Sequence, residues 1–187
     1  RSYDGRVEAC LGKGEGVPMA ECGGYGGNPG KPTERGLDAD ADAYYRWLIQ
    51  TGNIPESRIV FYGLSLGSGI AVDQAAKHSD AMALILEAPF TSLPDVARPR
   101  YFFLPVDLLM LDRYNNGKKI GKIDLPLLLM YGERDNIVPP VLGKRLFDLG
   151  NQPKTLKSYR EAGHNDVTDH GGIKDTLDFL ESLRLKR

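Results

Sequence analysis

The sequence predicts an α/β fold with a mainly parallel sheet and helices on both faces. Two observations lead to this prediction: short apolar runs alternate with helical patterns along the chain, and several of these runs end in a polar loop. Strands that alternate with helices form parallel sheets, because each crossover helix returns the chain to the same edge. The length of 187 residues fits a single domain, which we expect to span residues 1–187.

The first half of the chain contains two predicted strands, each followed by a helix. Residues 16–21 form a short apolar run, and residues 58–62 form a β-branched and aromatic run typical of a buried strand. A helix follows Thr33, whose hydroxyl suits a helix N-cap, and runs to about Gln50. A second helix covers residues 69–77. We expect the inner face of the first helix to carry Leu37, Ala41, Tyr44 and Leu48.

The second half continues the alternation of strands and helices. Residues 82–88 and 125–132 are apolar throughout most of their length, as expected of strands covered on both faces. Residues 154–160 alternate between polar and apolar side chains, which is typical of a half-buried strand. Residues 140–150 and 173–185 have the spacing of amphipathic helices.

Gly63-Leu64-Ser65-Leu66-Gly67 lies between a predicted strand and a predicted helix. A serine at such a tight strand-to-helix turn forms a nucleophile elbow, which raises its hydroxyl above the sheet. We expect the flanking glycines to be needed, because a side chain would clash where the backbone reverses. The helix N-terminus also offers backbone N–H groups, and the Leu66 N–H is the expected donor to a developing oxyanion.

Two further polar groups follow in loops after predicted strands. Asp135 comes shortly after the strand at 125–132, and His164 shortly after the strand at 154–160. The carboxyl ends of parallel strands share one edge of the sheet, so both side chains are expected beside Ser65. Glu133 and His170 are the rival acid and base.

The three residue types suit nucleophilic catalysis. A serine hydroxyl becomes a good nucleophile when a base takes its proton, and a neutral imidazole does this near neutral pH. A carboxylate holds the imidazole in one tautomer and stabilises the imidazolium. We therefore assign Ser65 as nucleophile, His164 as base and acid, and Asp135 as the group that orients it. His78, at a helix end, is interpreted as structural.

Five segments together resemble the α/β-hydrolase superfamily, and most closely its small serine-aminopeptidase-like or esterase-like serine hydrolases. They are residues 24–30, 62–69 (Tyr-Gly-Leu-Ser-Leu-Gly-Ser-Gly), 86–92 (Leu-Glu-Ala-Pro-Phe-Thr-Ser), 132–135 (Gly-Glu-Arg-Asp) and 163–166 (Gly-His-Asn-Asp). The resemblance implies hydrolysis of a small-molecule ester, thioester or amide through an acyl-enzyme, with no cofactor. Two alternatives stay open: a non-catalytic relative or inactive fragment that serves as a binding or scaffold domain, and an acyltransferase.

The sequence departs from the family pattern near its beginning. The family carries a His-Gly motif after an earlier strand, and its loop supplies a second oxyanion N–H, but no such motif precedes residue 16. In the family's strand order, the missing strand would lie between the strands at 16–21 and 58–62. We therefore expect an α/β-hydrolase fold that lacks its N-terminal strands, in a fragment of a longer protein.

Residues 91–122 interrupt the alternation with a short insert rich in proline and large apolar residues. In the family, this position forms a lid over the site. Phe102, Phe103 and Leu108 are the expected substrate-binding residues of an acyl pocket, although they would equally serve to pack the insert onto the sheet.

Composition excludes several other functions. The net charge of −1 gives no general attraction to nucleic acid. The most apolar run, 101–111, is too short to span a bilayer. Cys10 and Cys22 lack metal-ligand spacing, and the aspartates of residues 38–42 lack the glycine and glutamate of a calcium loop. We expect neither a metal nor an organic cofactor, and a cytoplasmic location.

Overall fold

The computed structural model describes Gly16 and residues 30–185. The predicted strand beyond Gly16, both cysteines and the glycine cluster up to residue 29 lie outside the described residues.

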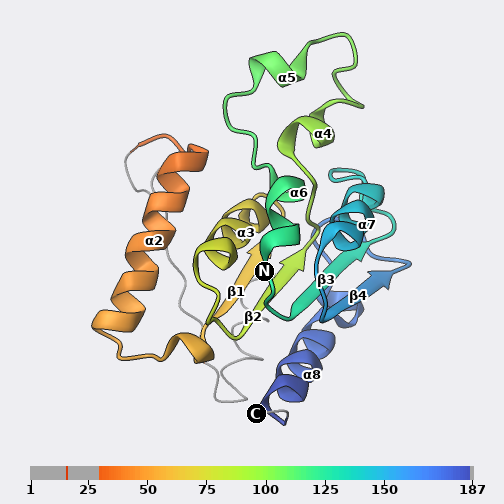
Figure 1. The fold of residues 1–187 in the computed structure, drawn as a ribbon. Coiled ribbons are helices and arrows are strands. Elements are labelled where there is room, and N and C mark those ends of the chain that lie inside the picture. Colours follow the sequence, from red (N-terminus) through yellow and green to blue (C-terminus); the bar gives the residue numbers. More distant parts are fainter. Residues whose placement is uncertain (1–15, 17–29, 186–187) are drawn as a thin grey trace.

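Four strands form one parallel sheet, as the sequence predicted (Figure 1). They are β1 (Val60–Leu64), β2 (Ala83–Glu87), β3 (Leu127–Gly132) and β4 (Lys154–Tyr159), and their order in the sheet is also their order in the chain. Each neighbouring pair is parallel and in continuous register, so the four carboxyl ends meet at one edge.

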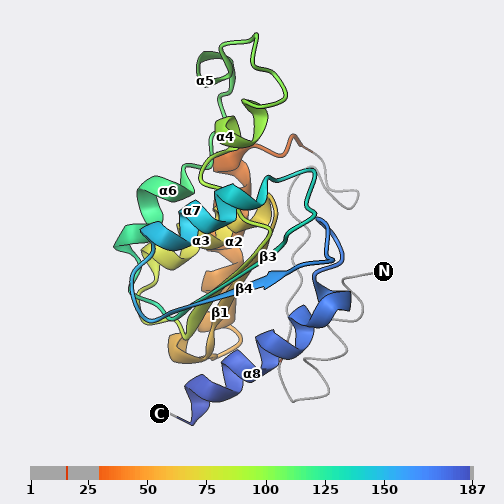
Figure 2. The same ribbon diagram turned by 90° about the vertical axis from the view of Figure 1, so that its right-hand side faces the viewer.

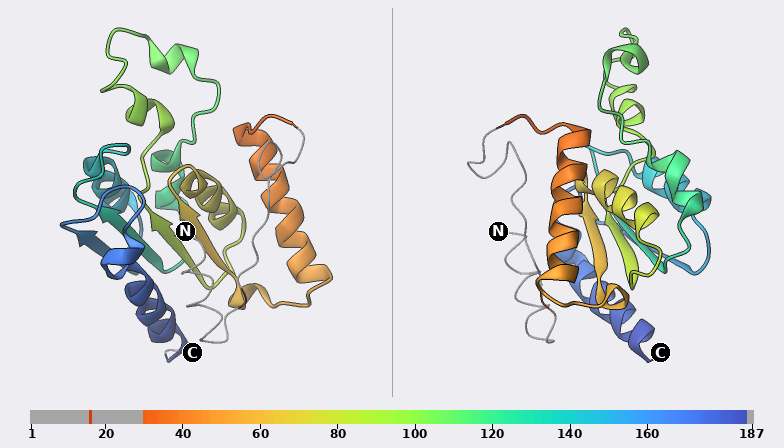
Figure 3. Two further views of the ribbon diagram at one scale, coloured as in Figure 1. Left: turned by 180° about the vertical axis from the view of Figure 1, so that it is seen from behind. Right: turned by 60° about the vertical axis from the view of Figure 1, so that its left-hand side comes forward.

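Helices cover both faces of this sheet (Figure 2). Helix α3 (Gly67–Lys77) and helix α7 (Pro140–Leu149) lie on one face, and α8 (Ile173–Arg184) lies on the other. Helix α2 (Glu34–Gln50) packs against α3 at the side of the molecule, as Figure 3 shows from behind. Two single turns, Glu56–Arg58 and Thr168–Gly172, precede β1 and α8.

The core is divided by the sheet into two apolar layers. Leu84 and Leu86 pack toward α3 and α7, whereas Ile85 packs toward α8. All five residues of β2 are buried, because side chains on both faces of this central strand are covered by helices. The continuous apolar run in the sequence is the direct result of this double coverage.

Helix α2 starts where the sequence predicted, but its inner face is rotated from the expected one. The Thr33 hydroxyl accepts the Gly36 N–H at 3.1 Å and caps the helix. The buried tyrosine is Tyr45, not the predicted Tyr44, because Tyr45 stacks on the His78 ring with 3.6 Å between ring centroids. His78 is thus structural, and burial lowers the pKa of its imidazole.

Two of the three aspartates of residues 38–42 bind side chains of the neighbouring helix. Asp38 and Asp42 both form ion pairs with Lys77, at 2.7 and 2.9 Å, and accept hydrogen bonds from Gln74. They therefore join α2 to α3.

The insert of residues 91–122 rises from the carboxyl edge of the sheet (Figure 1). It contains α4 (Leu93–Ala97), α5 (Val106–Leu109), α6 (Asn116–Lys119) and a 3-10 turn, Ile120–Lys122. None of the helices in residues 30–185 combines the length and apolar character that a bilayer crossing needs.

Candidate active site

Ser65 follows β1 directly, at the turn into α3. Its φ angle of 50° is left-handed, which is uncommon for a residue with a side chain and typical of a nucleophile elbow. The Ser65 N–H donates to the Glu87 carbonyl oxygen at 2.9 Å, so the neighbouring strand β2 holds the turn.

Only one of the two flanking glycines is required by contacts within the described residues. A Cβ on Gly63 would lie 2.6 Å from the Gly67 carbonyl oxygen and 2.8 Å from the Ala71 Cβ. A Cβ on Gly67 would meet no described atom within 4 Å, so the expected clash on that side is wrong. The close approach of α3 to β1 explains the requirement at Gly63.

Asp135 lies in the loop after β3 with its carboxylate buried and engaged on both oxygens. One oxygen, Oδ1, accepts the backbone N–H groups of Ile137 and Val138, each at 2.8 Å. The other, Oδ2, lies 2.7 Å from the His164 Nδ1. The side chain is only 1% exposed, so the loop fixes the carboxylate in one orientation.

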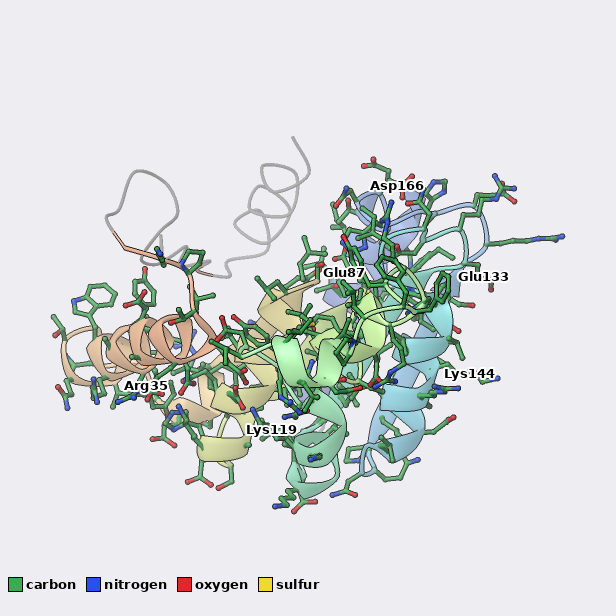
Figure 4. All side chains as sticks on the ribbon, turned by 90° about the horizontal axis from the view of Figure 1, so that it is seen from above. Arg35, Glu87, Lys119, Glu133, Lys144 and Asp166 are labelled. Atoms are coloured by element: carbon green, nitrogen blue, oxygen red, sulfur yellow. The ribbon has the colours of Figure 1, made fainter. Side chains whose placement is uncertain are left out.

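His164 lies in the loop after β4, which one hydrogen bond orders internally and another holds against the Asp135 loop. The Gly163 N–H donates to Asp166 Oδ1 at 2.6 Å, and the Arg134 N–H donates to the Ala162 carbonyl oxygen at 2.9 Å. Figure 4 looks down on this edge and shows the labelled Asp166 beside it. The imidazole is therefore positioned by the backbone of two adjacent loops.

A tyrosine at the end of β4 supports this loop from the α8 side. Burial, together with the hydrogen bond to Asp175, raises the pKa of the Tyr159 phenol. The phenol keeps its proton and donates to Asp175 Oδ2 at 2.7 Å, which links the end of β4 to the start of α8.

Ser65, His164 and Asp135 form a continuous chain of hydrogen bonds. The Ser65 Oγ lies 2.9 Å from the His164 Nε2, and the opposite ring nitrogen contacts the carboxylate. An ionised carboxylate only accepts, so the ring proton belongs on Nδ1 and leaves Nε2 free to accept the serine proton. The side chain of His164 is 8% exposed, which shields this chain from bulk water.

The rival residues lie elsewhere. The Glu133 carboxylate accepts the Ser158 hydroxyl at 2.9 Å, and His170 lies 3.7 Å from Asp166. Ser68, three residues beyond the elbow serine, is fully buried on α3, and its hydroxyl has no hydrogen-bond partner among the described residues.

The expected oxyanion donor is at the start of α3. Leu66 is the N-cap of this helix, and the first N–H groups of a helix lack intrahelical acceptors. The Leu66 backbone N–H is therefore among the donors that could bind a negatively charged oxygen beside Ser65.

The expected substrate-binding residues are not gathered into an enclosed pocket. Phe102, Phe103 and Leu108 are 83%, 68% and 80% exposed, on the outer surface of the insert. Two hollows of about 420 and 410 Å³ are lined by other residues of the chain. Side chains this exposed neither line an enclosed acyl pocket nor pack the insert onto the sheet, which were the two expected roles.

One residue that positions the site was missed by the sequence analysis. A Cβ on Gly132, the last residue of β3, would lie 2.6 Å from the Ala162 carbonyl carbon. Glycine at this position therefore allows the His164 loop to approach the Asp135 loop. In the sequence, the feature that could have indicated this role is the position of Gly132 between an apolar strand and the loop that carries Asp135.

Comparison with known proteins is consistent with this geometry. No family model matches the chain. An uncharacterized Mycobacterium tuberculosis protein is 41% identical over 158 residues, which is 84% of this chain and 56% of the relative. The alpha/beta hydrolase domain-containing protein 17B of Homo sapiens is 36% identical, covering 87% of this chain and 54% of the relative. The lysophosphatidylserine lipase ABHD12 of Danio rerio is 34% identical, covering 73% and 40%.

The chain spans about half the length of the curated relatives it matches. Among solved structures, the esterase domain of a Rhodothermus marinus protein superposes with a TM-score of 0.72 at 19% identity, covering 98% of this chain and 79% of that one. A Paleococcus ferrophilus monoacylglycerol lipase gives 0.69 at 21% identity, covering 97% and 88%. The chain therefore has the α/β-hydrolase fold, and its sequence is similar to those of alpha/beta hydrolase domain proteins.

Proposed function

We propose that this chain is a serine hydrolase that cleaves its substrate through an acyl-enzyme intermediate. The observation that supports it best is the hydrogen-bonded chain from the Ser65 Oγ through the His164 imidazole to the Asp135 carboxylate. Such a chain supplies a nucleophile, a base and a group that orients the base.

In the proposed first step, the Ser65 Oγ attacks the acyl carbonyl carbon while its proton passes to the His164 Nε2. The carbonyl oxygen becomes an oxyanion, which accepts the Leu66 N–H. Collapse of this tetrahedral intermediate breaks the bond to the leaving group, and His164 returns the proton to that group. Asp135 stabilises the imidazolium throughout, and the acyl group stays on Ser65.

In the second step, water replaces the leaving group. The His164 Nε2 takes a proton from the water, the resulting hydroxide adds to the acyl carbon, and collapse releases the acid. The proton returns to Ser65 Oγ, so the enzyme is regenerated without a cofactor.

We propose esters as the first substrate class to test, ahead of thioesters and amides. Two of the similar proteins are named as lipases and one as an esterase domain. The insert of residues 91–122, at the carboxyl edge beside Ser65, is our proposed lid.

Labelling with a fluorophosphonate probe tests the proposal, because the probe reacts only with an activated serine. We expect wild-type protein to be labelled and Ser65→Ala to remain unlabelled. Ser68→Ala is the matched control, since its hydroxyl is buried and has no hydrogen-bond partner among the described residues; it should label like the wild type. Absence of labelling in folded wild-type protein would instead favour a binding or scaffold domain.

A panel of p-nitrophenyl esters, thioesters and aminoacyl amides then separates the substrate classes. Adding a primary alcohol or amine as an acceptor distinguishes transfer from hydrolysis. We expect the free acid to be the main product, and mainly transferred acyl groups would indicate an acyltransferase.

A further inference from the structure

The outermost part of the insert exposes a concentration of large apolar side chains. We call residues 101–111 the apolar tip. Leu111 is 93% exposed, and Phe102 and Leu108 are each at least 80% exposed. Exposed apolar patches of this kind usually mark an interaction site. The large apolar side chains exposed on the tip are Tyr101, Phe102, Phe103, Leu104, Leu108, Leu109 and Leu111.

The tip is held in place by its two ends. At the returning end, the Glu34 carboxylate accepts the backbone N–H groups of Arg113 and Tyr114, at 2.7 and 3.0 Å, while Asp112 accepts the Glu34 N–H at 3.0 Å. At the N-terminal end of the insert, the Asp95 carboxylate accepts hydrogen bonds from the hydroxyls of Thr91 and Ser92. We call these two sets of contacts the lid base.

The interior of the tip is also organised. Val106 is buried on the inner side of α5, whereas Leu108 and Leu109 of the same helix are exposed. The Phe102 and Phe103 rings meet edge to face with 5.6 Å between centroids. The outward apolar surface is therefore part of a folded segment that projects from the body, as Figures 1 and 2 show.

The charges of the insert are only partly paired within it. Arg98 forms ion pairs with Asp95 and Asp107. Arg113 donates to the Asp107 carbonyl oxygen. Arg100, Arg113, Lys118 and Lys122 form no ion pair within residues 30–185, and of these Arg100 is exposed and directly precedes the tip. An apolar surface with one free guanidinium at its margin complements a lipid interface, where acyl chains lie below phosphate groups.

We propose that the apolar tip docks on a lipid bilayer. Its aromatic and aliphatic side chains enter the boundary between headgroups and acyl chains, and Arg100 binds a lipid phosphate. Aromatic residues are favoured at this depth because their rings tolerate both environments. The tip rises from the carboxyl edge that carries Ser65, so docking turns this edge toward the membrane. Docking itself does not depend on the proposed hydrolysis.

The few charges at the tip predict which lipids it binds and how its binding responds to salt. A polybasic surface binds through anionic lipid and is released by salt, whereas this tip has many apolar groups, no lysine or arginine of its own, and one exposed arginine, Arg100, directly before it. We expect binding to neutral phosphatidylcholine vesicles, with a gain of no more than about threefold when a quarter of the lipid is phosphatidylserine. Adding salt should change the binding by a similarly small factor.

Vesicle flotation measures the binding directly. Phe102→Ser combined with Leu108→Ser should lower partitioning to phosphatidylcholine vesicles by tenfold or more, because two large apolar side chains are no longer transferred from water to the acyl region. The matched control, Trp47→Ser combined with Leu185→Ser, removes exposed apolar side chains on α2 and beyond α8. The control should bind within about twofold of the wild type. All four replaced side chains are exposed, so folding is checked by thermal unfolding.

A fluorescence measurement gives an independent test. Trp47 is the sole tryptophan, so Phe102→Trp in a Trp47→Phe background reports on the tip alone. Its emission should shift to the blue with vesicles and be quenched by brominated acyl chains. Ser65→Ala should bind vesicles like the wild type, which separates docking from the proposed hydrolysis.

Three results would overturn the docking proposal. The first is equal vesicle binding by the tip variant and the control variant. The second is binding that requires anionic lipid and is lost in salt. The third is no vesicle binding by the wild type. If concentration-dependent dimers then form and the tip substitutions abolish them, a second copy covers the tip instead.

Discussion

Substitution of Gly132 by alanine tests how closely the two loops of the site must approach. The added Cβ would lie 2.6 Å from the Ala162 carbonyl carbon, about 0.9 Å short of the 3.5 Å at which carbon atoms normally meet. β3 is buried in the sheet, so the loop that carries His164 must move by nearly that amount. A misplacement of about 1 Å in a catalytic group costs on the order of 100-fold in rate. We therefore expect the Gly132→Ala variant to react with a fluorophosphonate about 100-fold more slowly.

The same substitution should also destabilise the fold. Overpacking of a well-packed position typically costs about 1–3 kcal/mol, measured here as the free energy of unfolding in urea. Labelling rates are compared at equal folded fraction, determined by circular dichroism. Gly163→Ala is the control within the same loop, because its Cβ would meet Asp166 at an ordinary 3.6 Å. Labelling of folded Gly132→Ala at the wild-type rate would refute this account of the close approach.

Three further predictions follow from named contacts. Asp135→Asn should slow the proposed hydrolysis by roughly 10⁴-fold, because an amide donor favours the wrong tautomer of the imidazole; the exposed Glu133→Gln should leave the measured rate within about twofold. Burial lowers the pKa of His78, so the unfolded chain binds its proton more readily, and the free energy of unfolding should fall as the pH drops through about 6.5. His78→Phe should flatten that dependence in urea titrations at several pH values, and an unchanged slope would exclude His78 as its source. Glu34→Ala leaves two backbone N–H groups of the lid base without their acceptor, at a cost of about 1 kcal/mol, visible as faster amide exchange there; unchanged exchange would contradict the anchoring role.

The sequence was sufficient to predict the parallel sheet and the positions of its four described strands along the chain. Periodicity distinguishes strands from helices because it records which faces of an element are buried. The residues of β2 and β3 are apolar almost throughout for this reason, and both strands were predicted to within two residues at each end. The sequence also predicted that Thr33 caps the helix, because capping depends on residues that are close together in the chain.

The errors concern contacts between segments that are distant in sequence. The choice between Tyr44 and Tyr45 depended on His78, which directly follows helix α3. The need for glycine at position 132 depended on the carbonyl group of Ala162. The exposure of Phe102 depended on the outward path of the insert, which composition does not specify.

The sequence by itself determined the kinds of residue at the proposed site and their positions after successive strands, because local pattern and strand order are properties of the chain. The tertiary structure decided that the His164 imidazole lies 2.9 Å from the Ser65 Oγ on one side and 2.7 Å from the Asp135 carboxylate on the other. It also decided that the apolar residues of the insert face outward. Distances of this kind arise only when segments about 100 residues apart pack against each other, since the energy that holds them comes from the shared core and from the hydrogen bonds between loops.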